Sequence, residues 1–305
     1  MRFLYVADLH LRQTRPEFRN DDWPDVCLNK LQQITDIASD CDFILCGGDV
    51  FDSYNASLRL VRSAARLFKK HYWYLCLGNH DMRGHNVGSY RDGPVGFLEE
   101  FVDSVRVLED SPDVFGEVTI TAHGFRHGID GERHFPSNVT RDKRHRVAVV
   151  VAHAHVLDHE AIYDHVVLED VETDADLFLC AHNHRQFSPR MVNGTVFCAP
   201  GSILRTDATE QNKKHRPMVL VVDVEGRSIK VSEKLLEFGE FDEVFEVASI
   251  ERKKQWTNRI DDFVEATQGF ETDEDDVVKR IRELAESEGI EQEVVDLAVE
   301  RVFHG

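Results

Sequence analysis

In the stretch "YLCLGNHDMRG", residues 74–84, an apolar run ends abruptly in polar residues. Apolar and aromatic residues lead into Gly78, and Asn79, His80 and Asp81 follow with no apolar residue among them. A short apolar run bounded by glycine is typical of a strand buried on both faces. We therefore expect a buried strand that carries a polar cluster at its carboxyl end.

Apolar runs alternate with segments of helical period in the first part of the chain. The apolar runs are "RFLYVAD" (2–8), "DFILCGGD" (42–49) and "YWYLCLGNHD" (72–81), and the helix-like segments are 25–39 and 57–70. This alternation predicts an α/β arrangement with helices packed over a sheet. After about residue 105 the runs are strand-like, at 117–125, 145–156, 175–184 and 189–198. Asn193-Gly194 and Glu225-Gly226 are hairpin turn signals.

Four other apolar runs end as the run before Asn79 does, with a carboxylate or an imidazole just past the run. They close with Asp8-x-His10, Gly48-Asp49-x-x-Asp52, His153-x-His155 and His182-x-His184. Ligands of open α/β sheets bind outside the carboxyl ends of the strands, because these ends converge there. Five such endings in one chain favour a shared site over unrelated solvated turns.

The residue types in these motifs indicate a metal centre. Asp, Asn and His offer oxygen and imidazole nitrogen, without the thiolates of a structural zinc site, which suits Mn²⁺, Fe²⁺ or Zn²⁺. The candidate ligands are Asp8, His10, Asp49, Asn79, His153, His182 and His184. This number predicts two ions, and an aspartate such as Asp49 can bridge two ions about 3.5–4 Å apart. Asn79 would be a neutral ligand in a centre that must still bind an anion.

His80 and Asp81 are the candidate catalytic residues. His80 lies one position past a ligand, so its side chain is better placed to face the substrate and to protonate a leaving oxygen. Asp81 would then hydrogen-bond the other ring nitrogen of His80 and fix its tautomer. Both roles are hypotheses drawn from the spacing.

Two positions in the motifs stay open at this point. His155 could be the ligand in place of His153, although His153 is favoured because it directly follows the apolar run "VAVVVA". Asp52 could support a ligand from behind, or it could be a turn residue before a helix. Asp-x-His alone carries almost no information, so the metal-site prediction depends on all five motifs occurring in order.

Together these residues resemble the signature of the calcineurin-like metallophosphoesterases. The chain carries "DLH", "GDVFD", "GNHD", "AHAH" and "AHNH" within residues 8–184. The resemblance implies an α/β (α+β) four-layer sandwich, in which two central mixed β-sheets are flanked by helices. It also implies a dinuclear metal centre and hydrolysis of a phosphoester by metal-bound water or hydroxide. Ala181 stands where the family usually has glycine, and its methyl group is small enough to leave His182 as a ligand.

A finer resemblance is to the SbcD-type nuclease subunits of double-strand-break repair complexes. It rests on "GDVFDSYNAS" (48–57), "VVVAHAHV" (149–156), "HNHRQF" (182–187) and "VFCAPGSILRTDA" (196–208). It implies a Mn²⁺-dependent exonuclease and endonuclease acting on DNA in repair or recombination, with Fe²⁺, Zn²⁺ or Mg²⁺ as alternative ions. It further implies a homodimer and a partner ATPase of the SbcC type.

The same resemblance distributes the ligands between the two ions. It gives Asp8, His10, Asp49 and His184 to one ion and Asp49, Asn79, His153 and His182 to the other, with His80 at the scissile phosphate and leaving group. A phosphodiesterase or phosphatase for small nucleotides or phosphoproteins would use the same centre and is the main alternative. A non-catalytic module would be expected to have lost ligands, and the set is intact here.

The charge of the chain argues against general coating of nucleic acid but leaves room for a local basic groove. The formal net charge is −20 over 305 residues, and much of the negative charge lies in residues 271–300. Basic residues cluster at 141–146 and 213–216. Four arginines near the motif loops are candidate phosphate contacts, namely Arg12, Arg83, Arg185 and Arg205.

Residues 1–240 are expected to form the catalytic domain, and residues 241–305 a small, mainly helical region. The helical segments would be 251–268, 273–287 and 291–303, and Thr272 with Asp275 resembles a capping box. The apolar stripe of this region would dock on the protein's own core, or it would bind a partner ATPase or a second copy of the chain. Both possibilities stay open.

We predict an intracellular, cytoplasmic protein with no membrane partner. The chain has no run of about 18 apolar residues, and its first residues lack the features of a signal peptide. Its six cysteines include no Cys-x-x-Cys pair, and most lie inside apolar runs. Reduced structural thiols are therefore expected, which fits a reducing compartment.

Overall fold

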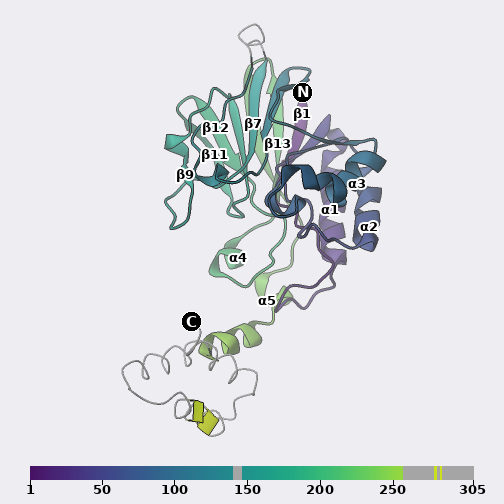
Figure 1. The fold of residues 1–305 in the computed structure, drawn as a ribbon, viewed down its shortest axis with the longest axis vertical. Coiled ribbons are helices and arrows are strands. Elements are labelled where there is room, and N and C mark those ends of the chain that lie inside the picture. The colour runs from purple at the N-terminus through teal and green to yellow at the C-terminus, as the bar shows by residue number, and fades with distance from the viewer. Residues whose placement is uncertain (140–145, 257–277, 280–281, 284–305) are drawn as a thin grey trace. The chain divides into compact units, whose positions relative to one another are not determined.

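The structure is a computed structural model that describes residues 1–139, 146–256, 278–279 and 282–283 (Figure 1). Its contacts divide the chain into two units, Met1–Phe245 and Glu246–Gly305. The functional division predicted for residues 1–240 and 241–305 stays a prediction.

The first unit contains two six-stranded sheets. The first sheet has the strand order β14-β13-β1-β2-β3-β4. Its strands are β1 (Arg2–Val6), β2 (Phe43–Cys46), β3 (Trp73–Leu75), β4 (Val105–Val107), β13 (Met218–Glu225) and β14 (Ser228–Leu235). β1 to β4 pair in parallel, whereas β13 is antiparallel to both of its neighbours, so the sheet is mixed.

The second sheet is also mixed, with the order β11-β12-β10-β7-β6-β5. Its strands are β5 (Asp113–Phe115), β6 (Val118–His123), β7 (Val147–His153), β10 (Leu177–Ala181), β11 (Phe187–Val192) and β12 (Thr195–Ala199). The four central strands are parallel, and both edge pairs are antiparallel. β8 (Val156–Leu157) and β9 (Val166–Val167) form a separate parallel pair. Two mixed sheets flanked by helices confirm the predicted fold class.

Alternate residues of the central strands face opposite sides of each sheet. Phe3 and Tyr5 of β1 share a buried cluster with Val149 of β7 and Leu179 of β10, which places this cluster between the sheets. The intervening residues of β1 pack in a second cluster with side chains of the helices. Because both faces of these strands are buried, their sequences read as continuous apolar runs rather than as alternating ones.

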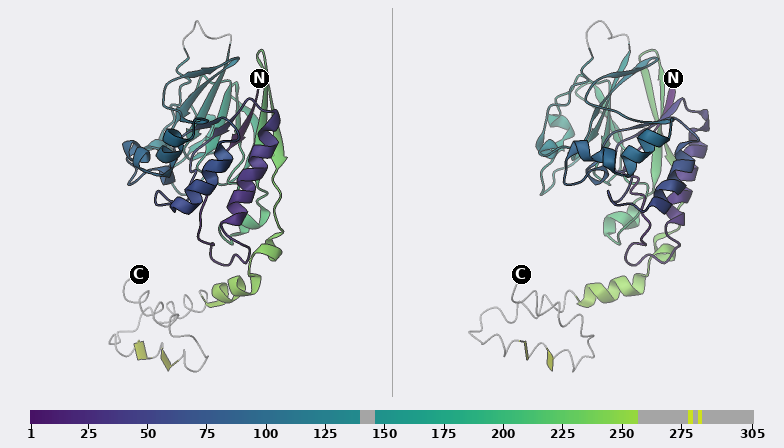
Figure 2. Two further views of the ribbon diagram at one scale, coloured as in Figure 1. Left: turned by 90° about the vertical axis from the view of Figure 1, so that its right-hand side faces the viewer. Right: turned by 45° about the vertical axis from the view of Figure 1, so that its right-hand side comes forward.

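Three helices cover the outer face of the first sheet. They are α1 (Asp25–Ile37), α2 (Leu58–Phe68) and α3 (Pro94–Phe101), and Figure 2 shows them side by side. Ser57 caps α2, because its side chain accepts a hydrogen bond from the backbone N–H of Leu60 at 3.3 Å. The helical segments predicted at 25–39 and 57–70 are confirmed.

Short turns and irregular segments cover the outer face of the second sheet. Phe135 packs against Phe178 of β10 with ring centroids 5.5 Å apart. The remaining short helices are η1 (Ala38–Asp40), η2 (Asn79–Asp81), η3 (Val87–Asp92), η4 (Ile129–Gly131), η6 (Leu168–Asp170), α4 (Glu210–Lys214) and α5 (Phe241–Val244). The sheet is therefore closed mainly by loops on this side, and these loops continue to the carboxyl ends of its strands.

Both predicted hairpins are present. Asn193 and Gly194 have φ values of 51° and 91° and join β11 to β12, as a two-residue turn with left-handed backbone requires. Gly226, with φ of 59°, turns the chain between β13 and β14. All six cysteines are free, and five of them are buried, which agrees with the predicted structural thiols.

Residues 247–256 are helical and include the start of the predicted segment 251–268. The predicted helices 273–287 and 291–303 lie outside the described residues, apart from 278–279 and 282–283, which are helical. Most of the basic segment 141–146 also lies outside them. Among the helices that the structure describes, none is long and apolar enough to cross a membrane.

The packing between the sheets can be tested at Leu179, which is fully buried. We expect Leu179→Ala to lower the free energy of unfolding by about 2–5 kcal/mol, because it removes apolar contacts and leaves a cavity. Urea denaturation measures the change. Leu235→Ala is the matched control, since that side chain is 53% exposed and its loss should cost less than about 0.5 kcal/mol. Equal costs at the two positions would contradict the assigned core.

Candidate metal centre

The loops that follow five parallel strands meet at one edge of the two sheets. Asp8 and His10 follow β1, Asp49 follows β2, Asn79 and His80 follow β3, His153 ends β7, and His182 and His184 follow β10. The carboxylates and imidazoles of these loops form clusters that could hold a metal ion, and neighbouring clusters share residues. The tertiary structure therefore contains the predicted convergence of strand ends.

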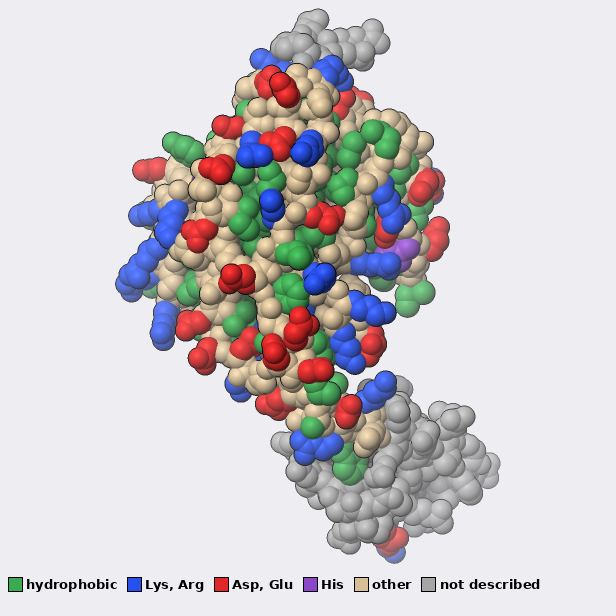
Figure 3. Space-filling model, turned by 180° about the vertical axis from the view of Figure 1, so that it is seen from behind, with side chains coloured by type: hydrophobic (Ala, Val, Ile, Leu, Met, Phe, Trp, Pro, Cys, Tyr) green, Lys and Arg blue, Asp and Glu red, His purple; other side chains and the backbone are tan. Residues whose placement is uncertain are grey.

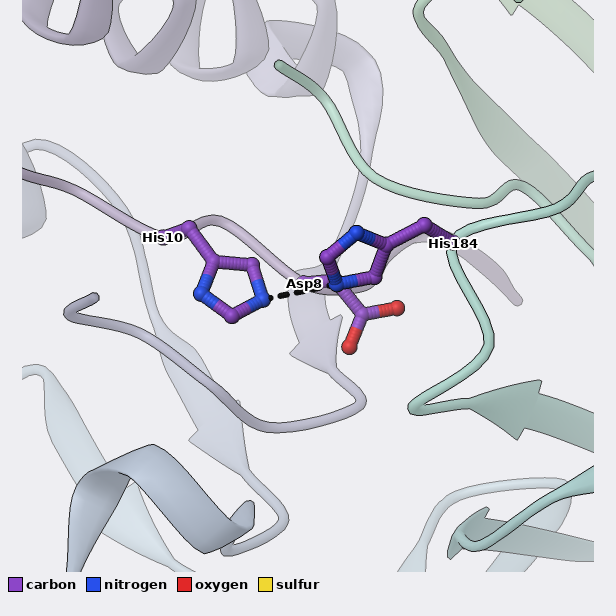
Figure 4. A group of neighbouring side chains, drawn as sticks. All are labelled: Asp8, His10 and His184. Carbon is purple, nitrogen blue, oxygen red and sulfur yellow. Dashed lines mark hydrogen bonds between the residues drawn. The ribbon is translucent and has the colours of Figure 1, made fainter. Parts of the chain in front are cut away.

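The first cluster consists of Asp8, His10 and His184 (Figure 4). The Nε2 atoms of His10 and His184 lie 2.9 Å apart. Asp8 Oδ1 accepts a hydrogen bond from the backbone N–H of His182, whereas Asp8 Oδ2 is buried with no hydrogen-bond partner among the described residues. A buried carboxylate oxygen without a partner is costly, and a cation at this position would satisfy it. The donor set fits a divalent ion.

The second cluster consists of Asp49, His153 and His182, with Asn79 beside it. His153 Nε2 lies 3.1 Å from Asn79 Oδ1 and 3.4 Å from Asp49 Oδ2. His153 Nδ1 lies 2.8 Å from the carbonyl oxygen of Gly47, which can only accept a hydrogen bond. Nδ1 therefore carries a proton, and Nε2, which faces Asn79 and Asp49, can coordinate an ion once its own proton is released.

Asp49 belongs to both halves of the centre. Its Oδ2 atom lies 3.5 Å from His10 Nε2 and 3.4 Å from His153 Nε2, on loops of different sheets. Burial alone would raise the pKa of Asp49, but the His153 and His10 imidazoles hold that pKa well below its usual range. The carboxylate is thus ionised and placed where one group can contact two cations.

Burial and the neighbouring carboxylates also shift the pKa values of the histidines in the site. Burial alone would lower the pKa of His153, but the neighbouring Asp49 carboxylate raises that pKa to about 9. Burial lowers the pKa of His184 to about 4, so this side chain is neutral at pH 7. Neutral imidazole is the form that coordinates metals, so His184 is ready to bind without releasing a proton.

Four of the predicted ligands have a left-handed backbone, which is uncommon for residues other than glycine. The φ values are 50° for Asp8, 41° for His10, 52° for Asp49 and 81° for His182. Such conformations cost on the order of 1–3 kcal/mol each and persist only when the surrounding structure enforces them. Here the backbone N–H of His10 donates to the carbonyl of Asp49 at 2.9 Å, which locks two ligand loops together.

Two glycines allow the loops to approach one another. A Cβ atom on Gly78 would lie 2.1 Å from Asp49 Oδ1, and one on Gly48 would lie 2.5 Å from His153 Nδ1. Ala181, the departure from the family pattern, packs where a Cβ on Gly47 would lie only 2.6 Å from its methyl group. The glycine at position 47 therefore leaves room for the alanine at position 181.

His80 lies beside the first cluster and is half-buried. Its backbone N–H donates to Asp49 Oδ1 at 2.9 Å, and its ring stands edge-on to His10 with centroids 4.8 Å apart. His80 Nδ1 lies 2.7 Å from the carbonyl oxygen of Asp52, so Nδ1 carries the proton. Nε2 is the nitrogen left to act on a bound molecule.

Residues 1–186 match the family described as calcineurin-like phosphoesterase. The chain belongs to this family. Members are hydrolases that typically bind two divalent metal ions, and the two clusters around Asp49 are the candidate sites for them here. The family relationship thus agrees with the chemistry of the donor set, while the identity of the ions and the role of each ligand stay predictions.

Individual proteins resemble the chain over most of its length. The DNA double-strand break repair protein Mre11 of Methanocaldococcus jannaschii is 24% identical over 288 residues, covering 85% of this chain and 72% of that protein. A dimetal phosphatase from Danio rerio is 9% identical, with 78% of this chain and 99% of that chain covered and a TM-score of 0.47. A purple acid phosphatase from yellow lupin is 13% identical, with coverage of 77% and 51% and a TM-score of 0.45.

The hydrogen bond predicted between Asp81 and the ring of His80 is absent from this calcineurin-like site, and a catalytic role for Asp81 stays a prediction. Its carboxylate does not pair with the ring of His80, whose Nδ1 faces the Asp52 carbonyl instead. The two Asp81 oxygens accept hydrogen bonds from the backbone N–H groups of Asp49, Val50 and Gly78 at 2.8–2.9 Å. These buried donors need an acceptor, and Asp81, which is 1% exposed, joins the loop after β2 to the loop after β3.

Asp52 and Arg12 lie next to His10. Asp52 Oδ1 is 3.6 Å from His10 Nδ1, and Asp52 Oδ2 is 3.4 Å from a terminal nitrogen of Arg12. This position behind His10 favours the supporting role for Asp52 over that of a turn residue, because a carboxylate at Nδ1 orients the ring and leaves Nε2 for an ion. Arg12 also donates to the carbonyl of Thr14 at 2.9 Å.

The other predicted phosphate contacts fall into two groups. Arg83 and Arg185 are exposed on the loops after β3 and β10. Arg205 is only 4% exposed, donates to the carbonyl of Gly239 and packs 5.1 Å above the ring of Phe238. The structure places it beside a separate cavity of about 450 Å³. A phosphate contact by Arg205 would require its guanidinium to leave these partners.

Asp130 is a residue of the site that the sequence analysis missed. Its Oδ1 accepts a hydrogen bond from the backbone N–H of His155 at 2.9 Å, and its Oδ2 lies 3.7 Å from His182 Nε2. The ring of His155 stacks on that of His182 at 4.1 Å. The structure therefore puts His153 beside Asp49 and places His155 behind His182. No motif marks Asp130, which comes from η4.

Asp130 is expected to orient His182 through Nε2 and leave Nδ1 for an ion. We predict that Asp130→Asn weakens Mn²⁺ binding about 10–100-fold, the usual effect of losing a carboxylate behind a ligand histidine. Isothermal titration with Mn²⁺ measures the affinity. Asp113→Asn is the matched control. Asp113 lies on the edge strand β5 and pairs with Arg106 of β4. Unchanged affinity in Asp130→Asn would contradict this role.

The three backbone hydrogen bonds that Asp81 accepts give a separate prediction. Asp81→Ala leaves three buried N–H groups without their acceptor and should lower the free energy of unfolding by about 3 kcal/mol or more. Urea denaturation of the metal-free protein measures this. Asp223→Ala, which breaks an exposed ion pair with Arg2, should change stability little. Wild-type stability with lost turnover in Asp81→Ala would instead return Asp81 to a catalytic role.

Proposed function

We propose that the chain is a dinuclear-metal-dependent phosphodiesterase that cleaves DNA, as an SbcD-type nuclease related to Mre11. The observation that carries the proposal is that Asp49 lies between the two clusters of candidate ligands, close to His10 of one and His153 of the other, with His80 directly beside them. The similarity to a DNA double-strand break repair protein over 85% of the chain favours DNA over other phosphodiesters.

The ligands divide between the two ions as follows. Asp8, His10, Asp49 and His184 would hold one ion, and Asp49, Asn79, His153 and His182 the other. Two divalent ions supply charge neutralisation on a phosphodiester and a nucleophile at neutral pH. Mn²⁺ is the ion we propose, and the same oxygen and imidazole donors also accept Fe²⁺, Zn²⁺ or Mg²⁺.

His80 would act on the leaving group. Its Nδ1 proton is held by the Asp52 carbonyl, and its backbone is held by Asp49, so the ring has a fixed direction relative to the ligands. In the imidazolium form Nε2 donates its proton to the leaving oxygen as the P–O bond breaks. Proton transfer of this kind contributes about 10²–10⁴-fold to the rate.

The charge distribution is compatible with DNA next to this centre. Arg12, Arg83 and Arg185 lie on ligand-bearing loops and would contact phosphates on either side of the cleaved bond. Figure 3 shows basic side chains interspersed with acidic ones on the face opposite to that of Figure 1. The proposal extends to a homodimer and to an SbcC-type ATPase that binds within residues 241–305.

The proposal is tested with the full chain, Mn²⁺ and end-labelled linear DNA, with a chromogenic diester assayed in parallel. We expect DNA cleavage that Asp49→Ala abolishes through loss of metal binding. His80→Ala should bind both ions and cleave about 10²–10⁴-fold more slowly. Asp113→Asn, remote from the ligands, should behave as the wild type.

The two assays separate the possible substrates. Cleavage of the diester with untouched DNA would overturn DNA as the substrate and favour an enzyme for small nucleotides or phosphoproteins. Full turnover in His80→Ala with both ions bound would overturn the general-acid role of His80 while leaving the metal centre in place.

A further inference from the structure

An exposed apolar pair, Ile162 and Tyr163, lies near the metal centre. The two residues form the tip of the loop 158–165, which connects β8 to β9. The side chain of Ile162 is fully exposed, and Tyr163 is 47% exposed. A fully exposed isoleucine does not gain the free energy that burial of its side chain would provide. Contact with another molecule would bury this tip.

The loop that carries this pair is held in shape by its own contacts. His165 Nδ1 lies 2.7 Å from the carbonyl oxygen of Tyr163, and the backbone N–H of Ala161 donates to His165 Nε2 at 3.2 Å. Asp158 at the start of the loop pairs with Arg190 of β11 at 2.8 Å. The tip is therefore presented in a fixed conformation, which lowers the entropic cost of contact with another molecule.

Tyr163 is linked directly to the ligand-bearing loop. Its hydroxyl oxygen accepts a hydrogen bond at 3.1 Å from the side-chain amide of Asn183, which lies between His182 and His184 in the chain. Its ring lies 4.8 Å from that of His155, and His155 stacks on His182. Only one side chain separates Tyr163 from a predicted ligand.

We propose that Tyr163, with Ile162 beside it, contacts the base of a nucleotide that flanks the cleaved phosphate. This inference rests on the proposed function. A strand whose phosphate lies at the ions must carry its next nucleoside over the surrounding loops, and Tyr163 belongs to one of these. An exposed aromatic ring stacks on any base, and an aliphatic side chain can insert between neighbouring bases.

Among the residues that the structure describes, the other large apolar side chains that are exposed lack this combination of features. Leu235 is exposed to a similar degree, but it ends β14 at the edge of the first sheet. Tyr163 is both exposed and tied to the segment that carries His182 and His184. We expect Tyr163 to contact a base because it lies next to the reacting phosphate. Exposure alone would not favour a base.

The test compares cleavage of a single-stranded oligonucleotide with that of a series in which one abasic residue replaces each nucleoside in turn. The full chain is assayed with Mn²⁺, and the measured quantity is the ratio of kcat/KM for the intact and the abasic strand. At one flanking position the wild type should prefer the intact strand about tenfold, as expected for one stacked base. In Tyr163→Ala this ratio should fall towards one.

Two variants serve as controls for this ratio. Tyr163→Phe removes the hydroxyl that Asn183 holds but retains the ring, so it should keep most of the preference. Leu235→Ala should keep all of it. Because each protein is compared on two strands, a general loss of activity or of folded protein does not change the ratio.

Failure of the inference can be told apart from failure of the proposed function. Cleavage by the wild type with a ratio near one at every position, or an undiminished ratio in Tyr163→Ala, would overturn the contact and leave the nuclease in place. No cleavage of any oligonucleotide would overturn the proposed function and this inference with it. A change of oligomeric state in Ile162→Ser with an unchanged ratio would assign the tip to contact between copies and overturn the base contact.

Discussion

The buried carboxylate of Asp49 organises the loops at the carboxyl ends of both sheets. It is 1% exposed, and its Oδ2 lies within 3.5 Å of imidazoles from both sheets. A buried carboxylate is tolerated only where cations or hydrogen-bond donors surround it. The neighbouring loops meet this demand, since His80 donates its N–H and Gly78 leaves room for the oxygen. Asp81 then fixes the backbone of Asp49 itself.

This arrangement needs two sheets that are fixed relative to one another before any ion binds. The apolar layer between them, which includes Tyr5 and Leu179, supplies that rigidity. The same rigidity allows Asp8, His10, Asp49 and His182 to keep a left-handed backbone. A metal ion in the first cluster would satisfy the unpaired oxygen of Asp8, so metal binding and the stability of the fold are coupled through this atom.

Around the predicted ligands lies a second set of side chains. Asp52 stands behind His10, and Asp130 with His155 stands behind His182. Tyr163 extends from this set to the surface through His155 and Asn183. In a family whose members act on many phosphoesters, such outer residues are where differences in metal affinity and substrate choice can arise without a change in the ligands.

The sequence was enough to predict the family and most of the central strands, and it marked the candidate ligands, because each candidate adjoins the end of an apolar run or a turn signal only a few residues away. The Asn193-Gly194 hairpin was predictable for the same local reason. The position of His153 beside Asp49, the backbone partners of Asp81 and the approach of Asp130 to His182 became visible only in the tertiary structure. These outcomes depend on which groups meet across the two sheets. These contacts are between residues far apart in the chain, such as Asp130 and His155. Neither periodicity nor motif spacing predicts such contacts.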